Sequence, residues 1–347
     1  MDYPRLSAEG SRGVKDALFQ ALTSIYAPVP AALANDAQMI LAFLLVAIGF
    51  YFLCVPGRRF SLRAAIDYVV RRDLFLHKTS RVDILHFVLT VAFWIPIIGA
   101  FVTLYLATDI SHLLVAWFGP RPALLQAGWM LAALQFLVIF VSRDFGSYVA
   151  HYLLHRIPLL WSVHRTHHSA EALTFFTSAR VHPLEYLHMQ AFIALFGGLG
   201  GSVLLYFTGT SLLAAPIVLL VVTGVFFESF GLAQHSHVRI SFGKLNVIFF
   251  APVLHQLHHS AEPRHRDKNL GSQLSIFDWL FGTLYVPEKG ESYRWGLNEE
   301  ELGPNNPHLR LRHFYLEPFG HAWRLLTARN VAKSDSVSIS QVQPSCE

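Results

Sequence analysis

The sequence predicts an all-α membrane protein: a multipass bundle of about four to five transmembrane helices with a cytoplasmic helical cap that carries a histidine-rich site for two metal ions. Composition is the first reason, because 53% of the 347 residues are hydrophobic and only 14% are charged. The mean hydropathy is +0.40. Soluble domains of this length are less apolar and more charged. The other two reasons are a series of long apolar runs and three clusters of histidines.

Five apolar runs have about the length of a membrane span. A helix needs roughly 20 apolar residues to cross the hydrocarbon core of a bilayer. The last two runs form a pair joined only by Thr208-Gly209-Thr210. The five predicted spans are Gln38 to Val55, Leu85 to Ala107, Leu124 to Val141, Leu187 to Phe207 and Leu212 to Leu232.

The charges between the runs predict the orientation. Basic residues outnumber acidic ones between Arg58 and Arg81, which is typical of a cytoplasmic loop. The segment from Asp109 to Pro122 has Arg121 as its only basic residue, so we expect it on the other side. When the spans are followed from this start, all three histidine clusters lie at the cytoplasmic surface. The arginines flank membrane spans and do not alternate with aromatic residues, so nucleic acid is not an expected partner.

The sequence predicts one folded unit. Residues 1–36 are expected to be an N-terminal lead-in without the order of a signal peptide, residues 37–332 the membrane domain, and residues 333–347 a disordered tail. Cys54 and Cys346 are too badly placed to form a structural disulfide. Motifs for nucleotide binding or a serine nucleophile do not occur, which argues against those classes of enzyme.

The histidine clusters have the spacing of metal ligands. Residues three or four apart lie on one face of a helix, so the imidazoles of each cluster converge. The clusters are His151-Tyr-Leu-Leu-His155, His164-Arg-Thr-His167-His168 and His255-Gln-Leu-His258-His259. With His235 or His237 as a ninth ligand, they exceed the four ligands of a structural zinc site and suit two metal ions. Imidazole binds several first-row metals, but only a redox-active pair such as iron can reduce O2.

The histidine clusters and their surroundings resemble the fatty acid hydroxylase and sterol desaturase superfamily of integral-membrane di-iron oxygenases. The resemblance covers residues 135–290 and includes the closing motifs Asp267-Lys-Asn269-Leu-Gly271 and Phe277-Asp278-Trp-Leu-Phe-Gly282-Thr283. His235 matches a family histidine, whereas His237 stands where the family usually has Asn. Leu270 replaces a common Tyr. The resemblance implies two non-haem iron ions that use O2 and external electrons.

Together these observations predict a lipid hydroxylase (monooxygenase), with a desaturase that uses the same site as the alternative. Candidate substrates are sterols, acyl or alkyl-ether chains and the headgroup of an aminolipid. A cytochrome b5 motif and a flavin domain do not occur, so a separate electron carrier of ferredoxin or cytochrome b5 type is expected. Two more distant alternatives are a divalent-metal transporter, whose sites lie near the midplane of the membrane, and an inactive lipid-binding homologue. The oligomeric state stays open.

Several polar residues near the clusters could support the ligands. Asp144 lies two helical turns before His151 and could orient a ligand imidazole. The candidates for such support are Asp144, His182, His237, Asp267, Asn269 and Asp278. The remaining histidines are scattered and are expected at the surface or the membrane interface: His77, His86, His112, His188, His265, His308, His313 and His321.

Overall fold

The computed structural model describes residues 29–55, 57–94, 97–98, 110–119, 128–209, 230–288, 290–302 and 305–339. The α-helices are α2 (Val29–Cys54), α3 (Leu62–Val69), α4 (Arg72–Phe75), α5 (Lys78–Leu89), α7 (Ile110–Phe118), α8 (Trp129–Arg156), α9 (Pro158–His168), α10 (Pro183–Thr208), α12 (Pro252–His258), α13 (Ile276–Phe281), α14 (Glu299–Leu302) and α15 (Leu311–Ile339). Among the described residues, β-structure is limited to two isolated bridges. This confirms the all-helical prediction.

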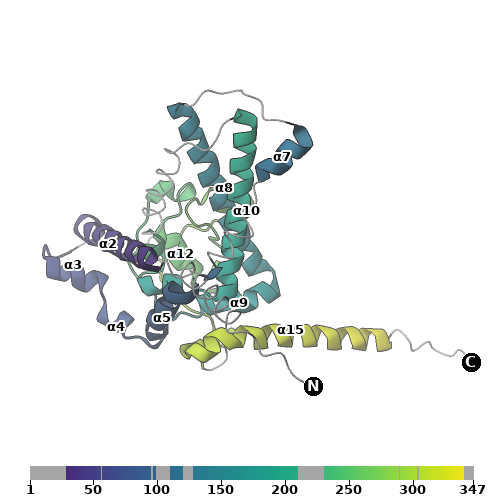
Figure 1. Ribbon diagram of the computed structural model, residues 1–347. Coiled ribbons are helices and arrows are strands. Elements are labelled where there is room, and N and C mark those ends of the chain that lie inside the picture. Colours follow the sequence, from purple (N-terminus) through teal and green to yellow (C-terminus); the bar gives the residue numbers. More distant parts are fainter. Residues whose placement is uncertain are drawn as a thin grey trace, which may run out of the picture.

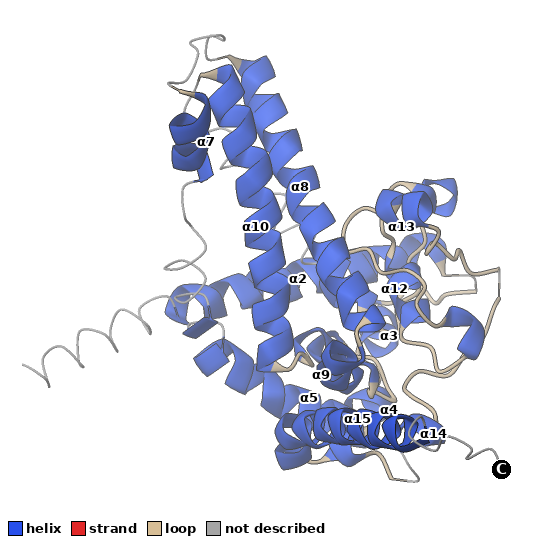
Figure 2. Ribbon diagram, turned by 90° about the vertical axis from the view of Figure 1, so that its right-hand side faces the viewer, coloured by secondary structure: helices blue, strands red, loops and turns tan. Residues whose placement is uncertain are grey.

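Helices α8 and α10 pack side by side along their length and form the tall part of the molecule (Figures 1 and 2). Glycines make this close approach possible. A Cβ atom at Gly146 of α8 would lie 2.6 Å from the carbonyl oxygen of Phe192, and one at Gly200 of α10 would lie 2.1 Å from Ser142 Oγ. Small residues at a helix contact let two backbones approach closely, as in membrane helix pairs. The pair fixes the position of the histidines at the end of α8.

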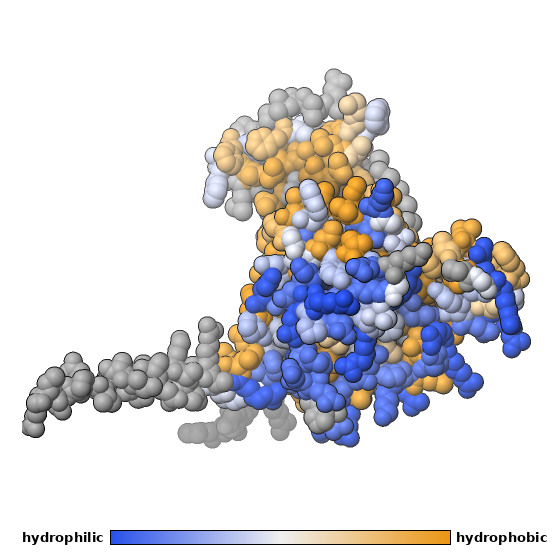
Figure 3. All heavy atoms as spheres, turned by 180° about the vertical axis from the view of Figure 1, so that it is seen from behind, coloured by the Kyte–Doolittle hydropathy of each residue, from blue (hydrophilic) through white to orange (hydrophobic). Residues whose placement is uncertain are grey.

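The surface of the molecule changes from apolar to polar along these two helices. Apolar side chains cover the upper part and hydrophilic ones the lower cap (Figure 3). Among the described helices, α8 and α10 are long and apolar enough to cross a membrane. They correspond to the predicted third and fourth spans. The helix that contains most of the third predicted span continues beyond it, because α8 runs from Trp129 past Val141 to Arg156 as one helix.

The other three predicted spans are described only in part. The first corresponds to α2, whose apolar stretch Ile40–Cys54 is shorter than a full span. The second begins in α5 and continues as a π-helix, Thr90–Trp94, and most of its later residues lie outside the described part. Nearly all of the fifth span also lies outside it. The number of spans therefore stays a prediction.

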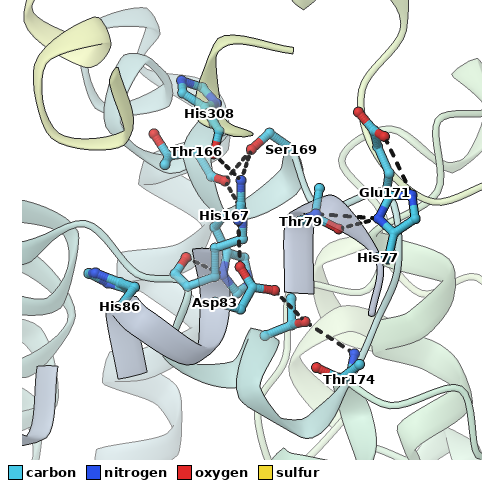
Figure 4. A network of polar contacts seen from close by, with 12 residues as sticks. His77, Thr79, Asp83, His86, Thr166, His167, Ser169, Glu171, Thr174 and His308 are labelled. Atoms are coloured by element: carbon cyan, nitrogen blue, oxygen red, sulfur yellow. Dashed lines mark hydrogen bonds and ion pairs between the residues drawn. The ribbon is translucent and has the colours of Figure 1, made fainter. Parts of the chain in front are cut away.

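A buried ion pair connects several segments in the lower part of the molecule. The Arg180 guanidinium contacts the carboxylate of Asp83 in α5, and both side chains are fully buried. Arg180 also donates to the Thr166 carbonyl oxygen at 2.9 Å, to Ser169 Oγ at 2.8 Å and to the His308 carbonyl oxygen at 3.3 Å. Figure 4 shows these partners around the pair. One side chain thus connects α5, α9 and the segment before α15, and its hydrogen bonds offset the cost of burying its charge.

Helix α15 lies across the lower end of α8 and α10 (Figures 1 and 2). It continues to Ile339, so the helix extends into the tail predicted from residue 333, because each further helical residue adds a hydrogen bond at little cost once the helix has formed. Similarly, α2 begins at Val29, within the predicted lead-in. The remaining residues of both terminal segments, 1–28 and 340–347, lie outside the described part.

Candidate metal centre

Five histidines from three helices form a first group, which we call the five-histidine group. Helix α8 supplies two of them on its last two turns, α9 supplies two, and α12 supplies one. Pro158 occupies the first turn of α9, where its missing N–H costs nothing, and it starts the new helix directly after α8 ends. The members are His151, His155, His164, His168 and His258, and their ligand nitrogens lie within 4.8 Å of one another.

A second group of four histidines, the four-histidine group, lies next to the first. Its members are His167, His235, His255 and His259, again with ligand nitrogens within 4.8 Å of one another. Neighbouring residues in a helix point about 100° apart. For this reason His167 and His168 of α9 enter different groups. His258 and His259 at the end of α12 divide in the same way.

The nitrogens that converge are Nε2 atoms. In the five-histidine group, His164 Nε2 lies 3.1 Å from the Nε2 atoms of His151, His155 and His168. In the four-histidine group, the Nε2 to Nε2 distances are 3.2 Å between His235 and His167, 2.9 Å between His255 and His235, and 3.1 Å between His259 and His255. Ligands about 2.0–2.1 Å from one metal ion lie roughly 3 Å apart, so these spacings fit coordination.

One short segment holds three imidazoles of the five-histidine group through their other nitrogen. His151 Nδ1 donates to the Leu270 carbonyl oxygen at 2.9 Å, and His258 Nδ1 donates to the Lys268 carbonyl oxygen at 2.8 Å. His155 Nδ1 lies 3.2 Å from the Asp267 carboxylate. Asp267 and Asn269 have positive φ values of 57° and 56°, a conformation that Asp and Asn tolerate better than most residues. The hydrogen bond from His151 uses the backbone oxygen of Leu270. It therefore does not depend on the side chain at position 270, where the family usually has Tyr.

Three other partners fix further imidazoles. Glu185, at the start of α10, places Oε1 2.8 Å from His164 Nδ1, and both side chains are buried. In the four-histidine group, His167 Nδ1 donates to the Arg180 carbonyl oxygen and His235 Nδ1 to the Gly231 carbonyl oxygen, each at 3.0 Å. Partners of this kind orient ligand imidazoles and set which nitrogen carries the proton.

These hydrogen bonds leave the converging Nε2 atoms free to bind a metal ion. A carbonyl oxygen can only accept, so Nδ1 of His167 and of His235 carries the proton and a neutral ring has a bare lone pair at Nε2. Burial lowers the pKa of His167 well below its usual value and that of His235 to about 4, so both rings are neutral at pH 7. The two Nε2 lone pairs then face each other at 3.2 Å. A bound metal ion removes this repulsion, so the donor set fits a metal.

The structure brings the nine predicted ligands together in the two groups, and His235 rather than His237 lies in one of them. His237 lies outside both groups, with its Nε2 2.6 Å from the Tyr68 carbonyl oxygen. Of the predicted supporting residues, Asp267 contacts a ligand imidazole. Asp144 does not, because its carboxylate accepts from the backbone N–H groups of Gln273 and Leu274.

The remaining predicted supporting residues bind backbone groups. His182 caps α10 by accepting from the Leu184 N–H. Asn269 donates to the carbonyl oxygens of Leu254 and Tyr285. Asp278 accepts from the N–H groups of Leu270 and Gly271, so it shapes the segment that holds His151 without touching the ring. Their support of the centre is therefore indirect.

Three of the scattered histidines are buried, which contradicts the expectation of surface positions. The side chains of His86, His265 and His308 are fully buried. Each has a polar partner: the Tyr315 hydroxyl for His86 and the carboxylates of Glu291 and Glu317 for the other two. Such partners offset the cost of burying a polar ring. Isolated histidines have no spacing pattern, so sequence alone gave no sign of these contacts.

Comparison with known proteins supports the resemblance found in the sequence. Residues 136–283 match the family model described as fatty acid hydroxylase. This part of the chain is therefore similar to fatty acid hydroxylase domains. The matched range includes α8 from residue 136 onward, α9, α12 and His235, so it contains all nine histidines of the two groups. No solved protein structure matches the chain.

Several curated proteins resemble this part of the chain. Ornithine lipid hydroxylase OlsE of Rhizobium tropici is 34% identical over 165 residues, which are 48% of this chain and 46% of that protein. Alkylglycerol monooxygenase of Caenorhabditis elegans is 26% identical over 174 residues, which are 48% of this chain and 30% of that protein. The human alkylglycerol monooxygenase is 29% identical over 145 residues, with 42% and 29% covered. The match thus spans less than half the length of these relatives.

Glu185 contacts the His164 imidazole but is not among the supporting residues predicted from the sequence. It follows His182 and Pro183 at the start of an apolar run, a position typical of polar residues at the membrane interface. An acidic residue within a helix that is apolar enough to span a membrane is costly to bury and usually has a function. The presence of an acidic residue in an apolar helix, rather than a spacing pattern, could have indicated Glu185 from the sequence.

Proposed function

We propose that this protein is a membrane-bound, O2-dependent lipid hydroxylase that holds two iron ions in the five-histidine and four-histidine groups. The observation that carries this proposal is the convergence of buried Nε2 lone pairs on two adjacent points within the region that is similar to fatty acid hydroxylase domains. The two iron ions would supply the reductive activation of O2 that hydroxylation of an unactivated C–H bond requires.

The chain's own residues have three tasks in this reaction. The six imidazoles in α9 and at the end of α12 present neutral donors, since burial lowers their pKa well below the usual value. Asp267, Glu185 and the backbone carbonyl oxygens fix the rings by accepting Nδ1 protons. The packed helices shield most of the rings from water, because all nine histidines are buried or nearly so. Such preorganisation means that little has to rearrange when the metals bind.

The substrate is a lipid that presents a C–H bond from the bilayer. Helices α8 and α10 can cross a membrane, and both groups lie at the polar end of α8. The named relatives are hydroxylases of ornithine lipid and alkylglycerol, so an aminolipid and an ether lipid are the first substrates to test. We place this end of α8 at the cytoplasmic face of a multipass protein, because the basic segment from Arg58 to Arg81 fixes that orientation. A separate ferredoxin or cytochrome b5 type carrier supplies the electrons.

Isotope labelling tests the proposed reaction. Purified protein with iron, a reducing system and isotopically labelled O2 should place one labelled oxygen atom in the lipid product. Hydroxylation and desaturation differ in whether that oxygen enters the substrate. An unlabelled product with a new double bond would assign the desaturase alternative, and oxygen insertion that is unaffected by removal of iron would contradict the proposal.

A further inference from the structure

A cavity of about 470 Å³ leads from the surface to the five-histidine group. His155, His168 and His258 form part of its lining, whereas no residue of the four-histidine group lines it. His258 is 3% exposed, and its Nε2 has no hydrogen-bond partner. The cavity therefore reaches only one of the two groups, and a molecule that enters it approaches that group first.

The cavity is acidic. Glu262, Asp267, Glu300 and Glu301 line it, and Arg266 is the only arginine or lysine among the lining residues. Arg266 forms an ion pair with Glu301, while Asp267 contacts His155 and Arg156. Among the described residues, Glu262 and Glu300 form no salt bridge, so the cavity has two carboxylates available for a cation. Anions would be repelled by this arrangement.

An aromatic wall adds to the attraction for a cation. Trp161 lines the cavity, and its ring lies 5.1 Å from that of His155 and 5.4 Å from that of His168 between ring centroids. The face of an indole attracts an ammonium group placed within about 6 Å of the ring. Trp161 thus provides a contact for a cation directly beside the histidines.

Two exposed apolar residues lie next to Pro158 at the end of α8. Ile157 and Leu159, which are 40% and 42% exposed, flank Pro158, and Pro158 lines the cavity. This position directly follows a helix that can cross a membrane. An acyl chain could lie against these two side chains while its polar headgroup enters the cavity.

We propose that this cavity binds the protonated amine of the substrate lipid's headgroup, with Glu262 and Glu300 as its counter-ions and Trp161 as its aromatic wall. This inference rests on the proposed function, because it names the class of substrate for the same centre. It predicts that lipids with a cationic headgroup bind better than matched neutral or anionic ones.

Binding without turnover tests this proposal. The full chain is loaded with zinc, which imidazoles accept and which has no redox chemistry, and is titrated calorimetrically with octylamine and with its uncharged amide, N-octylacetamide. The wild type should bind octylamine at least about fivefold more tightly, and the double variant Glu262→Gln/Glu300→Gln should lose most of this preference. Glu299→Gln is the control, because this exposed neighbour in α14 does not line the cavity.

The possible outcomes separate this inference from the proposed function. Equal affinity for amine and amide in the wild type, or an unchanged preference in the double variant, would overturn the headgroup site. Slower zinc loading of the double variant with unchanged amine binding would instead make the cavity a route for metal ions, and this too would overturn it. The zinc content and the labelled-oxygen experiment report on the centre itself. If the double variant holds less zinc, the two single variants are titrated instead.

Discussion

The segment from Asp267 to Leu270 controls three ligand imidazoles, and two of the three contacts use backbone oxygens. Such contacts depend on the path of the chain and not on side-chain identity. Asp278 fixes that path by accepting from the backbone N–H groups of Leu270, the last residue of the segment, and of Gly271, which follows it. The orientation of His151 and His258 therefore depends on residues that never touch a metal.

Loss of single ligands should affect the groups separately. Replacement of His258 by Ala removes a ligand from the five-histidine group, and His167→Ala removes one from the four-histidine group. We expect each variant to bind about one iron ion per chain and to lose hydroxylation. His313→Ala is the control, since this side chain contacts Arg312 outside both groups and activity should stay within a few fold. Full metal content and activity in both ligand variants would contradict the assignment.

Glu185 should act through His164. In Glu185→Leu the His164 Nδ1 proton has no acceptor, so the affinity of the five-histidine group for metal should fall about 10- to 100-fold. Glu185→Gln keeps an acceptor oxygen and should change the affinity only a few fold. Competition with a chelator measures both. An equal loss in the two variants would mean that Glu185 acts through its charge and not by accepting this proton.

The metal-free protein should lose stability as the pH falls from 6.5 to 5. The folded-state pKa of His235 is about 4, lowered by burial from 6.5, so the unfolded chain binds more protons in this range. The stabilisation is complete above pH 6.5 and decreases as the pH falls towards 4. Chemical unfolding of metal-free protein at the two pH values measures the effect. If the metal-free protein were as stable at pH 5 as at pH 6.5, or more stable, the His235 ring would not be neutral in the folded state.

The contact between α8 and α10 positions both the ligands of α8 and Glu185 of α10. Sequence correctly indicated that both helices exist, because each contains a long apolar run. The sequence did not indicate where α8 ends. The polar residues Ser142, Arg143 and Asp144 interrupt the apolar pattern directly after Val141. In the structure Asp144 is buried against backbone N–H groups, so the helix can continue to the histidines.

A single methyl group at this contact should be costly. In Gly146→Ala the new Cβ atom would lie 2.6 Å from the Phe192 carbonyl oxygen and 2.9 Å from Phe196 Cβ, so the helices must move apart. We expect a destabilisation of about 1–3 kcal/mol and weaker metal binding. Gly49→Ala in α2 is the control, because its Cβ atom would have no neighbour within 4 Å. Thermal unfolding in detergent compares the two, and equal midpoints would contradict the packing described here.

The arrangement of the whole molecule was only partly predictable. Local spacing identified eight ligand histidines, because residues three or four apart share a helix face whatever the fold. The division into two groups depends on how α9 and α12 pack, which no local pattern contains. His167 and His168, for example, are neighbours in sequence but belong to different groups. The same holds for the buried pair of Arg180 and Asp83, which joins segments far apart in the chain.

Topology in the membrane can be tested with reporter fusions. A reporter after Ala328 should read cytoplasmic, and one inserted near Pro120 should read external, because the basic segment from Arg58 to Arg81 is retained on the cytoplasmic side. Both fusions are compared in the same host with a reporter of known orientation. The reverse pattern would place both histidine groups at the external face.

The most direct test of the central claim is a crystal structure of the iron-loaded protein with data collected at the iron absorption edge. The anomalous map should contain two peaks per chain. One should lie within about 2.0–2.2 Å of Nε2 atoms in the five-histidine group and the other at the same distance from Nε2 atoms in the four-histidine group. A single peak, or peaks away from these nitrogens, would contradict a two-iron centre.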